Sequence, residues 1–297
     1  MKRTLLLIWL LAAATGLGAQ PLPMLYAPAG PREMALGGAG VALGADAWAA
    51  ESNFAAAALS ASTFAAGASY SLWAPGQQPD HRYAAGAWYR MNRVAAGLSV
   101  KGSVSAPYTA ASNAGQVAGT YTPQDFAVAA AASFRLADGL SLGVTARYTA
   151  SKLGESLSGS AFGADVSLCY AGPVLRAGLA VCNLGGSIRY GAGDAYAVPV
   201  RLRAALAAVL NALTFTAEAH WDAASGLSAA AGAEYRVLSP LALRAGYHFG
   251  SADRGLSSFA SAGFALSILQ GFCLEAAYLF ASPTLGNSFC AGLSYTF

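Results

Sequence analysis

The chain has 297 residues, of which 56% are apolar and only 10% are charged. Soluble proteins carry roughly a quarter charged residues, so this composition indicates that much of the surface contacts lipid. The formal net charge of +3 is too small to favour nucleic acid as a partner.

Residues 1–19 have the organisation of a secretory signal peptide. The basic residues Lys2 and Arg3 precede a short apolar run from Leu5 to Ala14, and small residues follow from Gly16 to Ala19. We therefore predict that the chain is exported and that this segment is removed, which leaves a nearly neutral protein. A retained membrane anchor is the alternative, although the apolar run is short for one.

Past this segment, the sequence predicts contact with a bilayer through strands. The first twenty residues are followed by no uninterrupted run of the roughly 18 apolar residues that a membrane-spanning helix requires. Strands can satisfy all their backbone hydrogen bonds in hydrocarbon only in a closed barrel. Residues 20–31 are too rich in proline for a ladder, and residues 32–59 lack alternation, so we expect the strands to begin near residue 62.

From Thr63 to Phe297, apolar residues alternate with small or polar ones, and the pattern predicts about fourteen strands. Each is close to the roughly 9–11 residues that cross a membrane at a tilt. The predicted strands cover residues 62–73, 82–90, 93–103, 122–135, 139–150, 160–170, 174–184, 198–209, 212–222, 227–238, 241–249, 257–268, 271–281 and 286–297.

The connections between these strands alternate between short and long. After the even-numbered strands they are minimal, as at Met91-Asn92 and Leu210-Asn211, whereas the connection from Ser105 to Tyr121 is one of several long ones after odd-numbered strands. Outer-membrane barrels have short periplasmic turns and longer extracellular loops. The pattern therefore places both termini in the periplasm.

Charged side chains share one parity in the predicted strands, and large apolar side chains share the other. Because an Arg or Lys facing lipid at mid-depth costs roughly 2–4 kcal/mol, we expect the charged face to line the barrel interior. A soluble β-sandwich also alternates, but it would place its charges outside. The residues predicted to pair across the lumen are Arg203, Glu218, Glu234, Arg244 and Glu275.

Two further patterns are typical of outer-membrane barrels. Aromatic residues near strand ends predict interfacial girdles, namely Tyr70, Trp73, Tyr83, Tyr89, Tyr148, Tyr190 and Trp221. The last strand alternates and ends at Phe297. It resembles the terminal strand of bacterial outer-membrane barrels, which implies recognition by the barrel assembly machinery.

No pattern in the chain predicts catalysis. The three histidines are scattered, and Glu218, His220 and Asp222 share a lumen face, where they suit either a metal or the charge pairing that any lumen needs. We favour charge pairing, and therefore predict no enzyme activity, no cofactor and no metal. The strand pairing also separates Cys169 from Cys182, and Cys273 from Cys290, too far for disulfides.

Residues 30–59 carry a family resemblance. Gly30-Pro-Arg32, Gly37-Gly-Ala-Gly40 and Asn53-Phe-Ala55 resemble the N-terminal signature of the FadL-type outer-membrane superfamily, including its short PorV/PorQ branch and a similar spirochaete group. The resemblance implies an all-β antiparallel barrel of about fourteen strands over residues 62–297, with residues 20–61 as a plug. This chain departs from the family pattern at two places. Phe54 stands where the family usually has Pro, and Asp46 is a single acidic residue where two are common.

The resemblance implies two functions. The chain would be a passive outer-membrane uptake channel for small hydrophobic molecules such as fatty acids, in contact with membrane lipid. The alternative is a PorV/PorQ-like component of type 9 secretion that binds exported proteins, and a purely structural barrel is a third possibility. For uptake, we expect a ligand pocket between plug and wall at Trp48, Asn53, Phe54, Trp73 and Trp88.

Overall fold

The structure is a computed structural model, and it describes residues 22–74, 79–111, 117–155, 157–251 and 256–297. The predicted signal peptide lies outside the described residues. Within these ranges, no helix has the length and apolar character needed to cross a bilayer.

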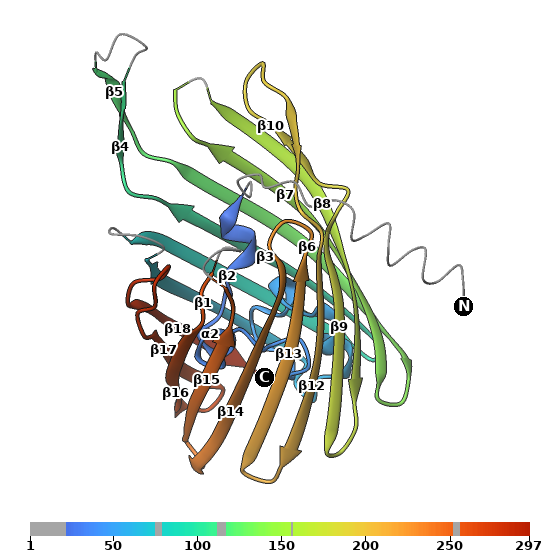
Figure 1. The fold of residues 1–297 in the computed structure, drawn as a ribbon. Helices are drawn as coiled ribbons and strands as arrows, with labels where there is room; N and C mark the ends of the chain where they lie inside the picture. The colour runs from blue at the N-terminus through green and yellow to red at the C-terminus, as the bar shows by residue number, and fades with distance from the viewer. Residues whose placement is uncertain (1–21, 75–78, 112–116, 156, 252–255) are drawn as a thin grey trace, which may run out of the picture.

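Fourteen antiparallel strands close into a barrel (Figure 1). Consecutive barrel strands pair with each other, and β1 pairs with β18 to close the ring. The strands are β1 (Phe64–Trp73), β2 (Asp80–Met91), β3 (Val94–Val104), β6 (Gln124–Ala137), β7 (Leu140–Lys152), β8 (Ser158–Ala171), β9 (Leu175–Leu184), β12 (Arg201–Leu210), β13 (Leu213–Asp222), β14 (Gly226–Leu238), β15 (Leu241–Phe249), β16 (Phe259–Leu269), β17 (Phe272–Leu279) and β18 (Ser288–Thr296). The predicted fold class is confirmed, and the predicted strand bounds agree to within three residues.

The end of the chain completes the seam of the barrel. The amide of Phe297 donates to the carbonyl oxygen of Phe64 at 2.9 Å, and the carbonyl oxygen of Phe297 accepts from the amide of Thr63 at 2.7 Å. Both edges of the sheet are thereby paired, which excludes the open or sandwiched sheet of a soluble protein.

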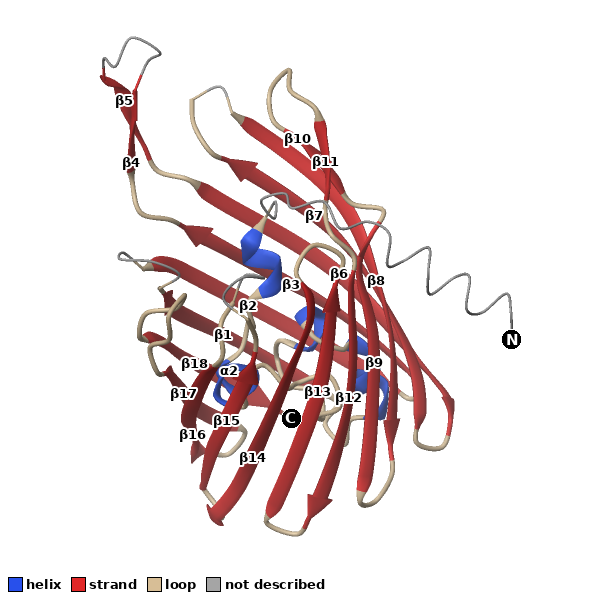
Figure 2. Cartoon of the chain, viewed as in Figure 1, coloured by secondary structure: helices blue, strands red, loops and turns tan. Residues whose placement is uncertain are grey.

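The two ends of the barrel differ in the length of their connections, and we name them the long-loop end and the short-turn end. Two hairpins extend the long-loop end, β4 (Tyr108–Ala111) with β5 (Val117–Tyr121) and β10 (Ser187–Arg189) with β11 (Ala195–Ala197), at the top of Figures 1 and 2. The sequence predicted long loops there and missed the strands.

The outer face of the barrel is apolar and the inner face carries the charges, as predicted. Leu98, Phe162 and Leu206 are exposed on the outside, whereas Lys101, Arg147 and Arg203 are buried inside. The girdle prediction is partly wrong. Tyr70, Tyr83, Tyr89 and Tyr148 are exposed, but Trp73 is buried on the inner face and the hydroxyl of Tyr190 donates to the Ser151 hydroxyl inside the barrel.

The N-terminal segment from Leu22 to Ser62 forms no strand and lies inside the barrel (Figure 2). It contains four short helical turns, η1 (Pro23–Tyr26), α2 (Pro31–Ala35), η2 (Ala49–Glu51) and η3 (Phe54–Leu59). Proline begins η1 and α2, where a missing amide proton does no harm. Asn53 caps η3 by accepting from the Ala55 amide at 3.1 Å. We call residues 22–61 the plug.

Glycines on the inner face let the plug approach the barrel backbone. A side-chain carbon added at Gly178 would overlap the carbonyl oxygen of Val41, and one added at Gly246 would overlap the backbone of Leu36. The wall glycines that a side chain would press against the plug are Gly67, Gly86, Gly97, Gly143, Gly178, Gly232, Gly246, Gly263 and Gly292. The wall backbone therefore lies close to the plug on many sides, against plug backbone at Gly86, Gly143, Gly178 and Gly246 and against plug side chains at the other five.

Gly178→Ala is expected to destabilise the barrel by about 1–3 kcal/mol, because overpacking forces the plug or the wall to shift. Gly163→Ala is the matched control, since the atoms nearest to its added carbon are 3.8 Å away. The measurement is the temperature at which the folded barrel loses its faster migration in detergent gels. Equal unfolding temperatures for the two variants would contradict a tightly held plug.

Candidate functional site

A cavity of about 410 Å³ lies between the plug and the barrel wall at the long-loop end. Met34, Gly37 and Gly38 of the plug form its floor, and side chains from β1, β2, β12, β13, β15, β16 and β17 form its walls. Leu256 and Thr284 line it from the connections at its rim. The cavity therefore opens toward the end of the barrel that carries the long loops.

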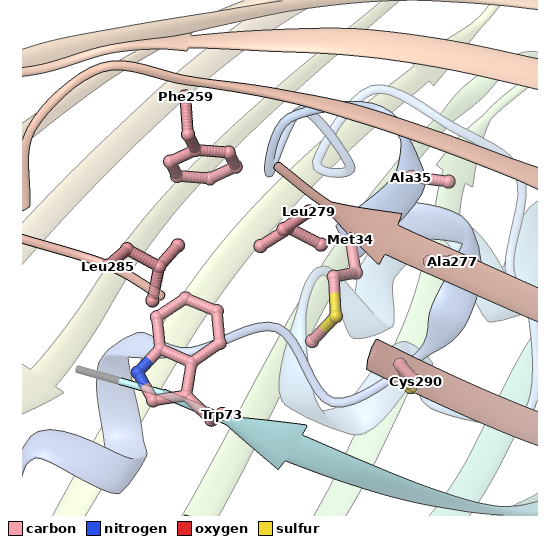
Figure 3. Packing of buried hydrophobic residues seen from close by; sticks show 8 residues of the cluster. All are labelled: Met34, Ala35, Trp73, Phe259, Ala277, Leu279, Leu285 and Cys290. Atoms are coloured by element: carbon pink, nitrogen blue, oxygen red, sulfur yellow. The ribbon is translucent and has the colours of Figure 1, made fainter. Parts of the chain in front are cut away.

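One side of this cavity is formed by members of an apolar cluster, whose side chains Figure 3 shows. Trp73, Phe259 and Leu279 project from three strands toward Met34 of α2, and Leu285 joins them from the connection between β17 and β18. Phe259 also stacks on the His248 ring, with centroids 5.0 Å apart and planes 12° apart. These groups offer an apolar ligand a largely preformed surface.

Polar side chains flank this apolar wall, with Arg82 of β2 beside Trp73 and Arg201 on β12. Arg82 Nη2 donates to Asp80 at 3.3 Å, and the Arg82 guanidinium lies 4.9 Å from the centroid of the Trp73 ring. Arg201 Nη1 donates to the Tyr26 carbonyl oxygen at 3.0 Å, and its Nη2 lies 3.1 Å from His220 Nδ1. A few oriented polar groups beside a large apolar wall are typical of small-molecule sites.

Of the five residues expected at a ligand pocket, the structure places only Trp73 in this cavity. Phe54 and Trp88 pack against each other, each 2% exposed, and Trp48 packs on Ala47 and Ala84. Asn53 donates to the carbonyl oxygens of Val41 and Leu168 at 2.8 and 3.0 Å. These four residues therefore hold the plug to itself and to the wall.

Sequence reasoning missed Phe259 and Leu279 as cavity residues, although the alternation carried a usable pattern. Both share parity with inward-facing neighbours, Phe259 with Ser261 and Leu279 with Ala277, so each is a large apolar residue on the face that otherwise carries small or charged ones. Large apolar residues of inward parity near the long-loop end mark the cavity wall.

Ion pairs join the barrel wall to the plug. Arg203 pairs with Glu218 of the wall and with Glu33 of the plug at 2.5 and 2.7 Å. Glu218 also accepts from the plug amides of Gly40 and Val41 at 2.8 and 2.9 Å. His220 Nε2 lies 2.8 Å from Glu218, and among the described residues no three His, Cys, Asp or Glu side chains are arranged to hold a metal.

The second lumen group follows the same design. Arg244 pairs with Glu234 and Glu275 at 2.7 and 2.6 Å, and Arg32 of the plug pairs with Glu234 at 3.0 Å. The five residues predicted to pair across the lumen thus form two groups, and the plug contributes a charged partner to each.

A third group, which the sequence did not predict, centres on Glu51 of the plug. Its carboxylate lies 2.8 Å from Lys101 and 3.3 Å from Arg147. Burial by itself raises the pKa of Glu51, and the cationic groups of Lys101 and Arg147 outweigh this effect and lower the pKa to about 2. The carboxylate therefore stays ionised inside the barrel.

Comparison with known proteins bears on the fold. No family model matches the sequence, and no curated protein matches it. Among solved structures, the Ralstonia pickettii toluene transporter TbuX superimposes with a TM-score of 0.68 at 16% identity, covering 90% of this chain and 97% of that one. The Pseudomonas putida toluene transporter TodX gives 0.68 at 13% identity, with the same coverage of each chain.

A Pseudomonas aeruginosa FadL homologue superimposes with a TM-score of 0.64 at 12% identity, covering 92% of this chain and 99% of that one. The chain has the fold of these proteins. The fourteen-stranded antiparallel barrel implied by the resemblance of residues 30–59 is thereby confirmed, and the comparison does not single out the PorV/PorQ branch.

Glu51→Gln is expected to destabilise the protein by about 3 kcal/mol at neutral pH, because it leaves the Lys101 ammonium buried without a counter-charge. Since the pKa of Glu51 is lowered from 4.5 to about 2, its stabilisation is present above pH 4.5 and is lost as the pH falls toward 2. Urea unfolding in lipid vesicles across this range measures the effect. The variant and the parent should converge at the acid end, whereas Glu155→Gln in an exposed loop should match the parent throughout.

Proposed function

We propose that this protein is an outer-membrane channel for the passive uptake of small hydrophobic molecules, such as monoaromatic compounds or fatty acids. The observation that carries the proposal is the apolar cavity above the plug, on the side that long loops would present to the outside. The fold shared with two toluene transporters supports it. Binding and release suffice for this role, so no chemical step is required.

The size of the cavity suits a small apolar molecule. An engineered protein cavity of about 150 Å³ lined by aliphatic and aromatic side chains binds benzene. The cavity of about 410 Å³ therefore has room for a substituted ring or a folded acyl chain.

The plug obstructs a straight path from this cavity to the short-turn end. A cavity inside the plug, lined by residues such as Gly30, Asp46 and Ser52, measures about 20 Å³, which is room for one or two water molecules. A ligand that moved straight through would have to displace the plug from its ion pairs and glycine contacts.

The wall between β8 and β9 supports a sideways exit instead. The register of this pair shifts between Ala164 and Val166, and Asn183 adopts a left-handed conformation there, with φ of 64°. The backbone amide of Asn183 donates to the Asp165 carboxylate of β8 at 2.8 Å instead of to a backbone carbonyl of that strand. Leu22, Ile188 and Val198 pack behind this irregular stretch. Side chains rather than a continuous ladder close the wall here.

The alternative role, binding exported proteins in type 9 secretion, is favoured by the β4–β5 hairpin, which extends beyond the barrel (Figure 1). Mass spectrometry of the purified protein separates the two roles. Co-purified apolar small molecules support uptake, and a stoichiometric exported protein supports the secretion role.

Leu256→Trp is expected to lower uptake several-fold, because the larger side chain fills the cavity from its rim. The measurement is the entry rate of radiolabelled toluene and decanoate into Gram-negative cells that lack their own FadL-type channels. Leu227→Trp is the control, since Leu227 is 67% exposed on the outer face. Uptake that is unchanged by Leu256→Trp would contradict passage through this cavity.

A disulfide across the irregular wall is expected to slow uptake. Ala164 and Leu184 are register partners on β8 and β9, so Ala164→Cys with Leu184→Cys places two thiols within bonding reach. Oxidation should reduce the toluene uptake rate and a reductant should restore it. A disulfide between Ala146→Cys and Ala164→Cys, partners across the regular β7–β8 ladder, is the control. Equal rates before and after oxidation of the β8–β9 pair would place the exit elsewhere.

A further inference from the structure

The cavity contains an arginine whose hydrogen-bonding capacity is mostly unused. Arg82 lies on the inner face of β2, is 8% exposed, and lines the cavity. A guanidinium carries five N–H donors. Nη2 of Arg82 donates to Asp80, whereas its buried Nε and Nη1 have no hydrogen-bond partner among the described residues.

Buried donors without a partner are unfavourable. Each costs about 1–3 kcal/mol, and more when the group is charged. Both nitrogens are covered by protein atoms in this structure, so an oxygen acceptor on a bound molecule reaches them through a turn of the flexible Arg82 side chain and then forms charge-assisted hydrogen bonds. The cavity is therefore better matched to a ligand with an oxygen anion than to a pure hydrocarbon.

The other charged groups that line the cavity already have partners. Glu33 pairs with Arg203 at 2.7 Å and Asp80 pairs with Arg82 at 3.3 Å. Arg201 lies 3.6 Å from Asp222 and also bonds to the Tyr26 carbonyl oxygen. Among the described residues, Arg201 has one donor nitrogen without a hydrogen-bond partner, Nε, whereas Arg82 has two.

The groups around Arg82 suit a flat ring. Its guanidinium lies over the Trp73 ring, and Phe259 and Tyr26 contribute two further aromatic surfaces to the same cavity. Aromatic side chains favour stacked or edge-to-face contact with a ligand ring. A ring with one carboxylate places its apolar body and its charge on matching sides of the cavity.

We propose that the cavity selects aromatic carboxylates over aromatic hydrocarbons, with Arg82 binding the carboxylate and the Trp73–Phe259 wall binding the ring. This inference rests on the proposed uptake function and narrows its substrate class.

The test uses fluorine NMR titrations of the full-length protein in detergent micelles with 4-fluorobenzoate and 4-fluorotoluene. Arg82→Gln should weaken 4-fluorobenzoate binding about ten- to hundredfold, the range expected for hydrogen bonds to a charged group. The same variant should leave 4-fluorotoluene binding within about twofold of the parent. Arg236→Gln, at an exposed residue of the short-turn end, is the control and should change neither.

The outcomes separate this inference from the function on which it rests. Equal weakening of both ligands by Arg82→Gln, or 4-fluorotoluene binding without 4-fluorobenzoate binding, would overturn the carboxylate selectivity and leave uptake standing. If neither ligand binds and Leu256→Trp leaves cellular uptake unchanged, both the carboxylate selectivity and the proposed uptake function are overturned. If Arg82→Gln fails to fold, the affinities of the parent protein for 4-fluorobenzoate and for its methyl ester are compared instead. Preference for 4-fluorobenzoate over its methyl ester supports the inference, and equal affinity refutes it.

Discussion

The structure depends on one constraint, that ionised side chains face into the barrel and find counter-charges there. A charge turned toward lipid would cost roughly 2–4 kcal/mol, so the outer face is left to apolar side chains. The lumen charges are then buried together, and buried charges need partners. The plug supplies them. Arg32, Glu33 and Glu51 each complete a group of wall residues, so the plug is an electrostatic part of the barrel.

The candidate site lies where the inner face of the barrel carries large apolar residues instead of paired charges. Near the long-loop end, Trp73, Phe259 and Leu279 replace the usual small or charged residues of the inner face, and the plug stops short of filling the space beside them. An apolar wall then faces the arginines of neighbouring strands. The same lumen is packed against the plug at one end and open to a small molecule at the other.

Much of the fold was predictable because alternation is a local property. The period-two pattern determines which residues form strands, and the cost of exposing charge to lipid determines which face is inside.

The ligand pocket was harder to predict, because the path of the plug follows no period. Trp48, Phe54 and Trp88 were expected at one pocket, yet Phe54 and Trp88 share one packed cluster between plug and wall and Trp48 lies in another. Trp73 was also assigned to the girdle, although its parity with Ser69 and Ser71 already placed it inside. The irregular β8–β9 pairing depends on a carboxylate that replaces a ladder bond, which composition and alternation do not reveal.

The inner-face glycines bear on how the protein is assembled. Because the wall backbone at Gly178 and Gly246 almost touches the plug, wall and plug can reach this fit only together. Closure of the sheet and folding of the N-terminal segment are therefore coupled.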